Sequence, residues 1–127
     1  MNSETESTLF KRVGGQGFFV SLIERFYDLV ESDPVLRPIY PTDLEPGKAH
    51  LAAFLAEYWG GPPRYSLQRG HPRLRMRHAQ FPIGQTVRDS WIGHMIAAVN
   101  SADLNPGDAV ELIGYFDRTA TFLMNQT

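Results

Sequence analysis

Residues 71–78 read His-Pro-Arg-Leu-Arg-Met-Arg-His, a short basic run that ends in a histidine. The run lies within a stretch from Tyr58 to Arg88 that has six arginines and two histidines but neither Asp nor Glu. Six of the twelve lysines and arginines are therefore left to balance all fourteen acidic residues elsewhere, although the formal net charge is only −2. This asymmetry predicts that a small anionic group docks on the stretch.

The composition indicates one domain over residues 1–127, long enough to bury roughly 65 to 70% of the surface of the unfolded chain. Cysteine is absent, which excludes disulfides, thiolate metal sites and thiol nucleophiles. Residues 1–8 are polar and acidic, and we expect a flexible N-terminal extension there. Since no secretion signal or apolar span is visible, we expect a cytoplasmic protein that does not enter membranes.

Apolar residues recur three and four positions apart through most of the chain, which is the spacing of helices with one buried face. We expect a short leading helix before Gly14-Gly15, then helices at 16–32 and 45–58, with a short turn after Asp33 between them. A long loop should follow Gly60-Gly61, and Pro72 should begin a short helix that ends near His78. Two more helices should begin near Thr86 and at Asn105-Pro106. Because no segment alternates like a strand, the predicted class is all-α.

The same spacing predicts which side chains point inward. In the last three long helices these are Leu51, Phe54, Leu55 and Tyr58, then Val87, Trp91, Met95 and Ala98, then Val110, Ile113, Phe116, Ala120 and Leu123.

His78 has the surroundings that a ligand of haem iron needs, namely an apolar slot for the ring and cations for the propionates. Leu74 lies one helical turn earlier and Phe81 follows, while Arg75 and Arg77 can pair with carboxylates. The alternative is a solvated histidine favoured by the dipole at a helix C-terminus. A zinc site made of His71 and His78 would lack a third ligand, because no acid lies between them.

Tyr27, Tyr40 and Trp91 are aromatic residues with polar tips inside apolar stripes, and such tips need partners when they are buried. Oxygen on ferrous haem carries partial negative charge, so two hydroxyls and an indole N–H beside it would stabilise it by hydrogen bonds. Core packing with bonds to backbone carbonyls is the alternative for each. We interpret His71 as a structural residue near a helix start, and His94 as a solvated or hydrogen-bonded helix residue.

Five motifs together resemble the truncated haemoglobins. They are Gly14-Gly15, Phe26-Tyr27, Tyr40-Pro41, the run Phe-Leu-Ala-Glu-Tyr-Trp-Gly-Gly-Pro at 54–62, and the run that extends from Gly70 to His78. The resemblance covers nearly the whole chain from Phe10 to Asn125. It is to the second group of that family, the oxygen-avid branch.

This resemblance implies a two-over-two helical sandwich around one haem b, iron protoporphyrin IX, with His78 as the proximal iron ligand. Tyr27, Tyr40 and Trp91 match the distal donors of the family, and Leu51 and Phe54 match its apolar wall. We expect Tyr65, Arg75, Arg77 and Phe81 to contact the cofactor as well. Gly47 stands where ordinary globins place a distal histidine. His50 replaces a propionate-binding arginine of close relatives, so its contact should be weaker or pH-dependent.

The expected function is reversible binding or transport of O2, with CO and NO as further ligands. The alternative on the same scaffold is peroxidase-like or nitric-oxide-oxidising turnover. That would need a separate reductase, since the chain has no flavin or nicotinamide fingerprint. A homodimer contact made by surface apolar residues also stays open.

From a different class, a nucleic-acid binder would use the arginines with Tyr65 and Trp59 as stacking residues. The acidic remainder of the chain argues against it. A hydrolase is poorer still, since neither a glycine-flanked serine elbow nor a cysteine nucleophile is present.

Overall fold

The computed structural model describes residues 8–126, all of them in helices and their connections, with no strand in this part of the chain. The elements are α1 (Leu9–Val13), α2 (Gln16–Glu31), the 3₁₀ helix η2 (Arg37–Ile39), α3 (Glu45–Tyr58), α4 (Arg64–Arg69), α5 (Leu74–His78), α6 (Gln85–Asn100) and α7 (Pro106–Phe122). The all-α class is confirmed. Of the extension expected over 1–8, residues 1–7 lie outside the described residues, and Thr8 caps α1 by accepting a hydrogen bond from the backbone N–H of Lys11.

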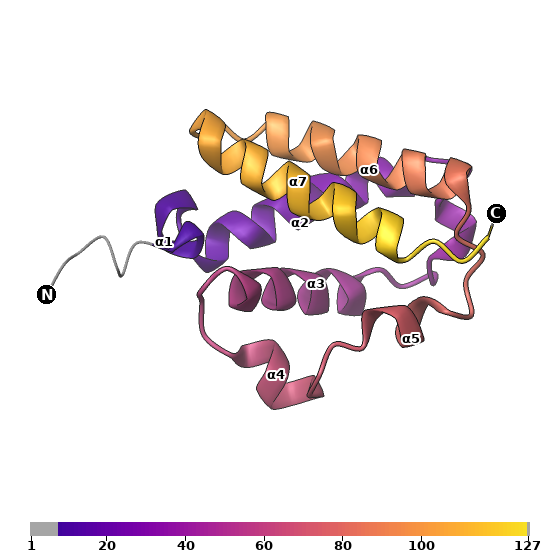
Figure 1. Cartoon of the computed structure of the whole chain (residues 1–127), viewed down its shortest axis with the longest axis horizontal. Coiled ribbons are helices and arrows are strands. Elements are labelled where there is room, and N and C mark those ends of the chain that lie inside the picture. The colour runs from indigo at the N-terminus through magenta and orange to yellow at the C-terminus, as the bar shows by residue number, and fades with distance from the viewer. Residues whose placement is uncertain (1–7, 127) are drawn as a thin grey trace, which may run out of the picture.

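Two helix pairs make up the body of the molecule. The α2 helix packs on α3, α6 packs on α7, and α2 also contacts α6, so that the pairs lie one over the other (Figure 1). The short helices α4 and α5 hang below α3, on the side away from the α6–α7 pair (Figure 1). This arrangement is the two-over-two sandwich that the resemblance implied. None of the described helices is both long and apolar enough to cross a bilayer.

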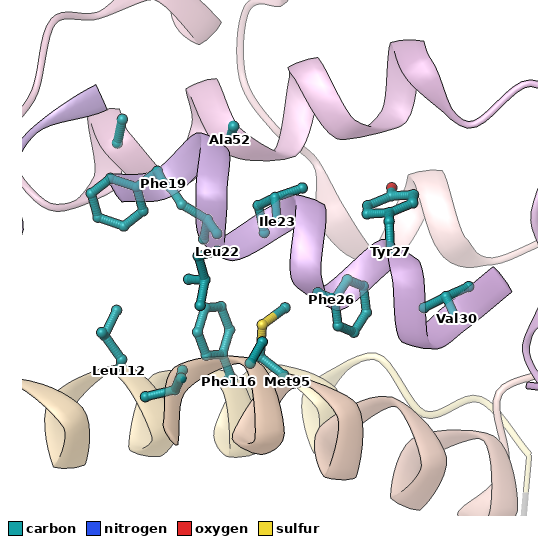
Figure 2. Packing of buried hydrophobic residues seen from close by; sticks show 14 of the residues in the cluster. Phe19, Leu22, Ile23, Phe26, Tyr27, Val30, Ala52, Met95, Leu112 and Phe116 are labelled. Atoms are coloured by element: carbon teal, nitrogen blue, oxygen red, sulfur yellow. The ribbon is translucent and has the colours of Figure 1, made fainter. Parts of the chain in front are cut away.

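The core lies between α2 and the α6–α7 pair. Phe19, Phe26 and Val30 of α2 are completely buried, and from the facing pair Met95 and Leu112 are completely buried as well (Figure 2). Each such side chain contributes roughly 1.5–3 kcal/mol relative to an exposed position. Tyr27 belongs to the same buried cluster, but its hydroxyl points toward α3, whereas Phe26 beside it points toward α6 and α7 (Figure 2).

Two of the predicted inward positions are wrong. Tyr58 is 54% exposed because it lies in the last turn of α3, although its ring contacts those of Phe54, Trp59 and Tyr115. Val110 is 71% exposed, and Leu112, which was not predicted, occupies the core instead. The buried face of α7 therefore runs through Leu112 and Phe116, rotated from the stripe that would have included Val110.

Several predicted boundaries also differ. The loop after Gly61 contains a helix, α4, that is held by Glu57: its carboxylate accepts hydrogen bonds from both the backbone N–H and the hydroxyl of Ser66. Pro72 does not begin α5, since Arg73 adopts a left-handed conformation (φ 47°) and the helix begins at Leu74. Gly84 rather than Thr86 precedes the first turn of α6, and no side chain caps it.

Candidate functional site

A cleft with two adjoining lobes opens between the helix pairs and the α4–α5 segment. The first lobe has a volume of about 280 Å³ and the second about 240 Å³. Both lobes are lined by Tyr27, Tyr40, His78, Trp91 and Leu123, so these residues stand where the lobes meet. Taken together, the lobes have the size of a small-molecule or cofactor site, roughly 300–1,000 Å³.

Different elements line the rest of each lobe. The first lobe is completed by Leu36, Ile39, Pro41, Phe81, Ile83, Val87, Arg88 and Ala120. The second is completed by Gly47, His50, Leu51, Phe54, Leu55, Tyr65, Arg69, Leu74, Arg77, Tyr115, Phe116 and Thr119. Most of these side chains are apolar, which suits a flat hydrophobic group with a few polar contacts at its edge.

His78 is the last residue of α5, and its ring is held by that helix. Its Nδ1 lies 2.7 Å from the backbone carbonyl oxygen of Leu74. A carbonyl only accepts hydrogen bonds, so Nδ1 carries a proton, and in the neutral ring Nε2 is the nitrogen that has the lone pair. Histidines that bind metals usually donate their other ring N–H to a carbonyl or carboxylate in this way. The Phe81 ring packs edge-on against His78 at 6.5 Å.

The segment after His78 is fastened by Asn125, a residue that the sequence interpretation did not use. The Asn125 amide donates to the carbonyl oxygens of Phe81, at 2.8 Å, and His78, at 3.3 Å. Its Oδ1 accepts from the Ile83 N–H at 2.9 Å, and its own N–H donates back to Ile83 at the same distance. The proximal wall is therefore fixed on both sides of Phe81.

Tyr40 lies at the end of a short corner between α2 and α3 that is held by hydrogen bonds from both ends. At its start the Asp33 carboxylate accepts from the Val35 N–H at 2.7 Å and from Nε2 of His94 at 2.6 Å. At its end the Arg37 guanidinium donates to the carbonyl oxygens of residues 40, 41 and 42 at 3.0–3.3 Å. His94, expected to be a solvated or hydrogen-bonded helix residue, thus ties α6 to this corner.

The three expected distal donors come together. The Tyr27 and Tyr40 rings pack edge-on with centroids 5.6 Å apart, and both residues line the two lobes together with Trp91. An indole N–H only donates, so a hydrogen bond from Trp91 to the Tyr40 oxygen would leave the Tyr40 O–H free to donate. Burial raises the pKa of Tyr27 to about 12, partly opposed by Lys48, and burial raises the pKa of Tyr40 as well. Both hydroxyls therefore stay protonated at neutral pH.

Gly47 lies against the Tyr27 hydroxyl. A Cβ atom at position 47 would be only 2.8 Å from Tyr27 Oη, closer than such contacts occur in proteins. The adjacent Lys48 forms ion pairs with Glu24 on α2 at 3.1 Å and with Glu45 at 3.0 Å. The absence of a side chain at position 47 therefore leaves the space that Tyr27 occupies.

A basic edge is formed where His50, Arg69 and Arg77 line the second lobe. The structure shows no ion pair for either arginine within residues 8–126, and Arg69 lies 3.4 Å from His50 Nε2. Partial desolvation, followed by repulsion from Arg69 and Arg77, lowers the pKa of His50. A carboxylate placed here would meet two guanidinium groups and a histidine that is mostly neutral at pH 7.

Arg75 was expected beside Arg77 at the cofactor, but the structure places it elsewhere. Its guanidinium lies over the Phe122 ring at 5.1 Å, and it lines neither lobe, because successive helical positions point in different directions. Arg69 takes the place at the cleft instead, with its guanidinium 6.0 Å from the centre of the Tyr65 ring. The one feature of the sequence that pointed to Arg69 was the absence of acidic residues around it.

The remaining predicted contacts lie in the cleft wall. Leu51, Phe54 and Tyr65 line the second lobe, where the rings of Phe54 and Tyr65 meet edge-on at 5.3 Å. His71 does not reach the cleft lining, and its Nδ1 accepts a hydrogen bond from the Arg73 N–H at 3.1 Å. Within residues 8–126, no group of three or more His, Asp or Glu side chains could hold a metal ion. A single histidine in an apolar cleft with a cationic edge fits haem better than a zinc site.

Comparison with known proteins agrees with this geometry. The family model of the bacterial-like globins matches residues 8–125. The group 2 truncated haemoglobin YjbI of Bacillus subtilis is 38% identical over 113 residues, which are 89% of this chain and 86% of that protein. The group 2 truncated haemoglobin 3-1 of Lotus japonicus is 34% identical over 94% of this chain and 73% of its own length.

Solved structures show the same likeness. The haemoglobin of Chloroflexus aurantiacus superposes with a TM-score of 0.92 at 48% identity, over 94% of this chain and 99% of its own. The truncated oxygen-avid haemoglobin of Bacillus subtilis superposes with a TM-score of 0.88 at 34% identity, over 94% and 100%. A globin of this kind is a haem protein that binds gaseous ligands. The chain belongs to the bacterial-like globin family, as a truncated haemoglobin of the second group.

Proposed function

We propose that the protein binds haem b through Nε2 of His78 and takes up O2 reversibly, with CO and NO as further ligands. The observation that carries the proposal is the hydrogen bond from His78 Nδ1 to the Leu74 carbonyl oxygen, 2.7 Å long. It fixes the tautomer in which Nε2 can bind a metal, inside a cleft of suitable size and polarity. The likeness to a protein described as a truncated oxygen-avid haemoglobin supports O2 as the main ligand.

Different residues of the chain would have different roles in binding the cofactor. When bound, the haem supplies the iron at which a diatomic gas coordinates. Leu51, Phe54 and Phe81 would exclude water from the porphyrin, and Arg69 and Arg77 would pair with its propionates. His50 contributes less charge, because its pKa is lowered.

Tyr40 is the donor that we expect to dominate on the distal side. Hydrogen bonding from Trp91 opposes the burial-driven rise in the pKa of Tyr40. An indole N–H donated to the Tyr40 oxygen would polarise the Tyr40 O–H bond and make it a better donor toward a ligand. Arg37 and Asp33 hold the backbone of the corner, so the hydroxyl is already in place when the ligand arrives. Tyr27 provides a second donor at an edge contact of 5.6 Å from Tyr40.

Visible spectroscopy tests the cofactor and its ligand. The protein purified with haem should show a Soret band that shifts on adding carbon monoxide, and substitution of His78 by Gly should abolish this ligation. His71→Gly is the matched control, since His71 belongs to the same basic run and lines neither lobe. Haem retained with an unchanged CO spectrum in His78→Gly would refute the assignment of the iron ligand.

Rapid mixing tests the distal donors. In Tyr27→Phe, Tyr40→Phe and Trp91→Phe, oxygen should dissociate faster by roughly two- to tenfold for each hydrogen bond lost, which corresponds to about 0.5–1.5 kcal/mol. Trp91→Phe should act partly through Tyr40, so its effect should shrink when Tyr40 is already replaced by Phe. Unchanged dissociation in all three variants would contradict the distal network.

A further inference from the structure

The proximal helix α5 begins with a strained residue. Arg73, which directly precedes the first turn of α5, has φ 47° and ψ 53°, and within residues 8–126 it is the one residue other than glycine with a positive φ. A side chain makes this left-handed region unfavourable, so another interaction has to hold the residue there. The Arg73 side chain itself forms no capping hydrogen bond with the helix. The start of α5 therefore depends on a contact from outside the helix.

His71 makes that contact. Its Nδ1 accepts a hydrogen bond from the backbone N–H of Arg73 at 3.1 Å. Asn and Asp hold turns in the same way, with a side-chain acceptor that binds the N–H two residues on. A backbone N–H only donates, so Nδ1 of His71 has a free lone pair and the proton of the neutral ring is on Nε2. His78, at the other end of α5, has its proton on Nδ1 instead.

The turn before α5 is also bonded to the last turn of the helix. Nε of Arg77 donates to the Pro72 carbonyl oxygen at 2.7 Å, and the Arg77 N–H donates to the Arg73 carbonyl oxygen at 3.0 Å. The next carbonyl, that of Leu74, lies 2.7 Å from Nδ1 of His78. A helix of five residues is not stable without such contacts, because ordering its first turn costs more than the hydrogen bonds recover. The conformation of Arg73 thus sets the position of the carbonyl that orients His78.

We propose that His71 is a positioning residue for the iron ligand, and that it makes haem retention sensitive to pH. This role rests on the proposed function, in which His78 binds the haem iron. While the His71 ring is neutral, Nδ1 holds Arg73 and fixes the start of α5. Once Nδ1 takes up a proton it can only donate, so the Arg73 N–H loses its acceptor and the strained residue is released. Imidazoles usually gain a proton between about pH 8 and pH 5, so acidification through this range should speed haem loss.

No carboxylate is placed to take over from Nδ1. The segment from Tyr58 to Arg88 has neither Asp nor Glu, and no ion pair joins His71 to an acid within the described residues. On α3, the Glu57 carboxylate accepts hydrogen bonds from Ser66. The other ionisable groups near the turn are basic: His50 on α3, Arg69 on α4, Arg73 itself, and Arg75 and Arg77 on α5. Protonation of Nδ1 therefore leaves the Arg73 N–H to solvent.

Haem transfer to apomyoglobin at about pH 8 and about pH 6 tests the proposal, with His71→Asn as the matched variant. The Asn oxygen can accept the same hydrogen bond but does not titrate. On acidification, transfer from the natural protein should speed up roughly two- to tenfold more than transfer from His71→Asn, the range for one hydrogen bond lost. Protonation of His78 itself affects both proteins alike. An equal acceleration in the two proteins would overturn the proposal.

Removing the strain tests the same contact from the other side. His71→Leu has no acceptor at any pH, so it should release haem faster than the natural protein even at about pH 8. In an Arg73→Gly background the same change should have little effect, because glycine adopts the left-handed conformation readily. Equal effects of His71→Leu in both backgrounds would contradict the role of Arg73. The CO spectrum should be the same in all variants, since His71 and Arg73 line neither lobe.

NMR of the CO-bound protein gives a readout that does not depend on haem transfer. The Arg73 amide resonance should shift with pH in step with the ring nitrogens of His71, and it should not do so in His71→Asn. An Arg73 amide that does not follow the His71 ring would overturn the proposal while leaving the iron ligand assigned. Absence of a Soret band that shifts with CO, which is checked first, would instead refute the haem assignment and this proposal with it.

Discussion

Substitution of Gly47 by Ala should displace the Tyr27 hydroxyl and speed oxygen release. The new Cβ would lie 2.8 Å from Tyr27 Oη, whereas ordinary contact begins at 3.4 Å, so the two atoms must separate by about 0.6 Å. Tyr27 cannot absorb this shift freely, because its ring is buried and packs edge-on against Phe26 and Tyr40 at 5.6 Å each.

Two quantities follow from that displacement. A hydroxyl moved by about 0.6 Å leaves the usual donor distance of about 2.7–2.8 Å, so most of a hydrogen bond worth about 0.5–1.5 kcal/mol is lost. Oxygen dissociation should then rise roughly two- to tenfold. For stability, the gain of about 0.5–1 kcal/mol from removing a helical glycine is opposed by about 1–3 kcal/mol of overpacking.

A double-mutant cycle with Tyr27→Phe isolates the cause. The clash involves only Oη, since the next nearest atom of Tyr27 would be at an ordinary 3.7 Å. In the Tyr27→Phe background, Gly47→Ala should therefore leave oxygen dissociation unchanged and stabilise the fold. Stopped-flow kinetics and urea unfolding of the four proteins give both coupling energies.

Gly93→Ala is the matched control for helix propensity. Gly93 lies within α6, and a Cβ there would meet nothing within 4 Å. It should gain up to about 1 kcal/mol of stability without changing oxygen release. If Gly47→Ala speeds release equally in the natural sequence and in the Tyr27→Phe background, the steric argument is wrong.

Three further predictions concern the cofactor, the corner and the core. Arg69→Met and Arg77→Met should each speed haem transfer to apomyoglobin, roughly two- to fivefold for one exposed ion pair, whereas Arg75→Met should not, because Arg75 lines neither lobe. Asp33 has a lowered pKa, chiefly through its hydrogen bond with His94, so its contribution to stability should be full above the unfolded value of 3.8 and vanish as the pH falls through the lowered value. Urea titrations of Asp33→Asn at a series of pH values check this, and a stability difference that stays constant into strong acid would contradict it. Met95→Ala should cost about 2–5 kcal/mol of unfolding free energy because Met95 is completely buried, while Val110→Ala should change it by less than about 0.5 kcal/mol.

The long helices could be predicted from the sequence because their own residues determine them. The apolar stripe of α2 and the Asn105-Pro106 start of α7 needed no information from elsewhere, and Asn105 indeed caps α7 by accepting from the Gly107 N–H. The α4 helix could not be predicted in that way. Its Leu67 is 82% exposed, so α4 has no apolar face that a sequence pattern could reveal. The hydrogen bonds that hold α4 are donated by Ser66 to Glu57, which belongs to another helix.

The candidate site was likewise predictable from the sequence only in part. His78 and the donors Tyr27, Tyr40 and Trp91 were recognisable from motifs, and the structure gathers them at the junction of the two lobes. Whether Arg69 or Arg75 faces the cleft depends on how α4 and α5 are oriented. No local sequence pattern predicts that orientation. Asn125 was equally invisible, since its partners lie 42 to 47 positions away in the sequence.

The anchoring of the corner by Arg37 has a practical meaning for anyone who reads mutant kinetics. The guanidinium donates hydrogen bonds to the main-chain oxygens of residues 40 to 42. These bonds do not depend on which side chain stands at position 40. Exchanging Tyr40 for Phe therefore removes the hydroxyl at position 40 and leaves the backbone of the corner held by Arg37. Substituting Arg37 would instead release the backbone of the corner. Tyr40→Phe thus reports on the hydroxyl group, whereas an Arg37 variant reports on the position of the backbone that carries it.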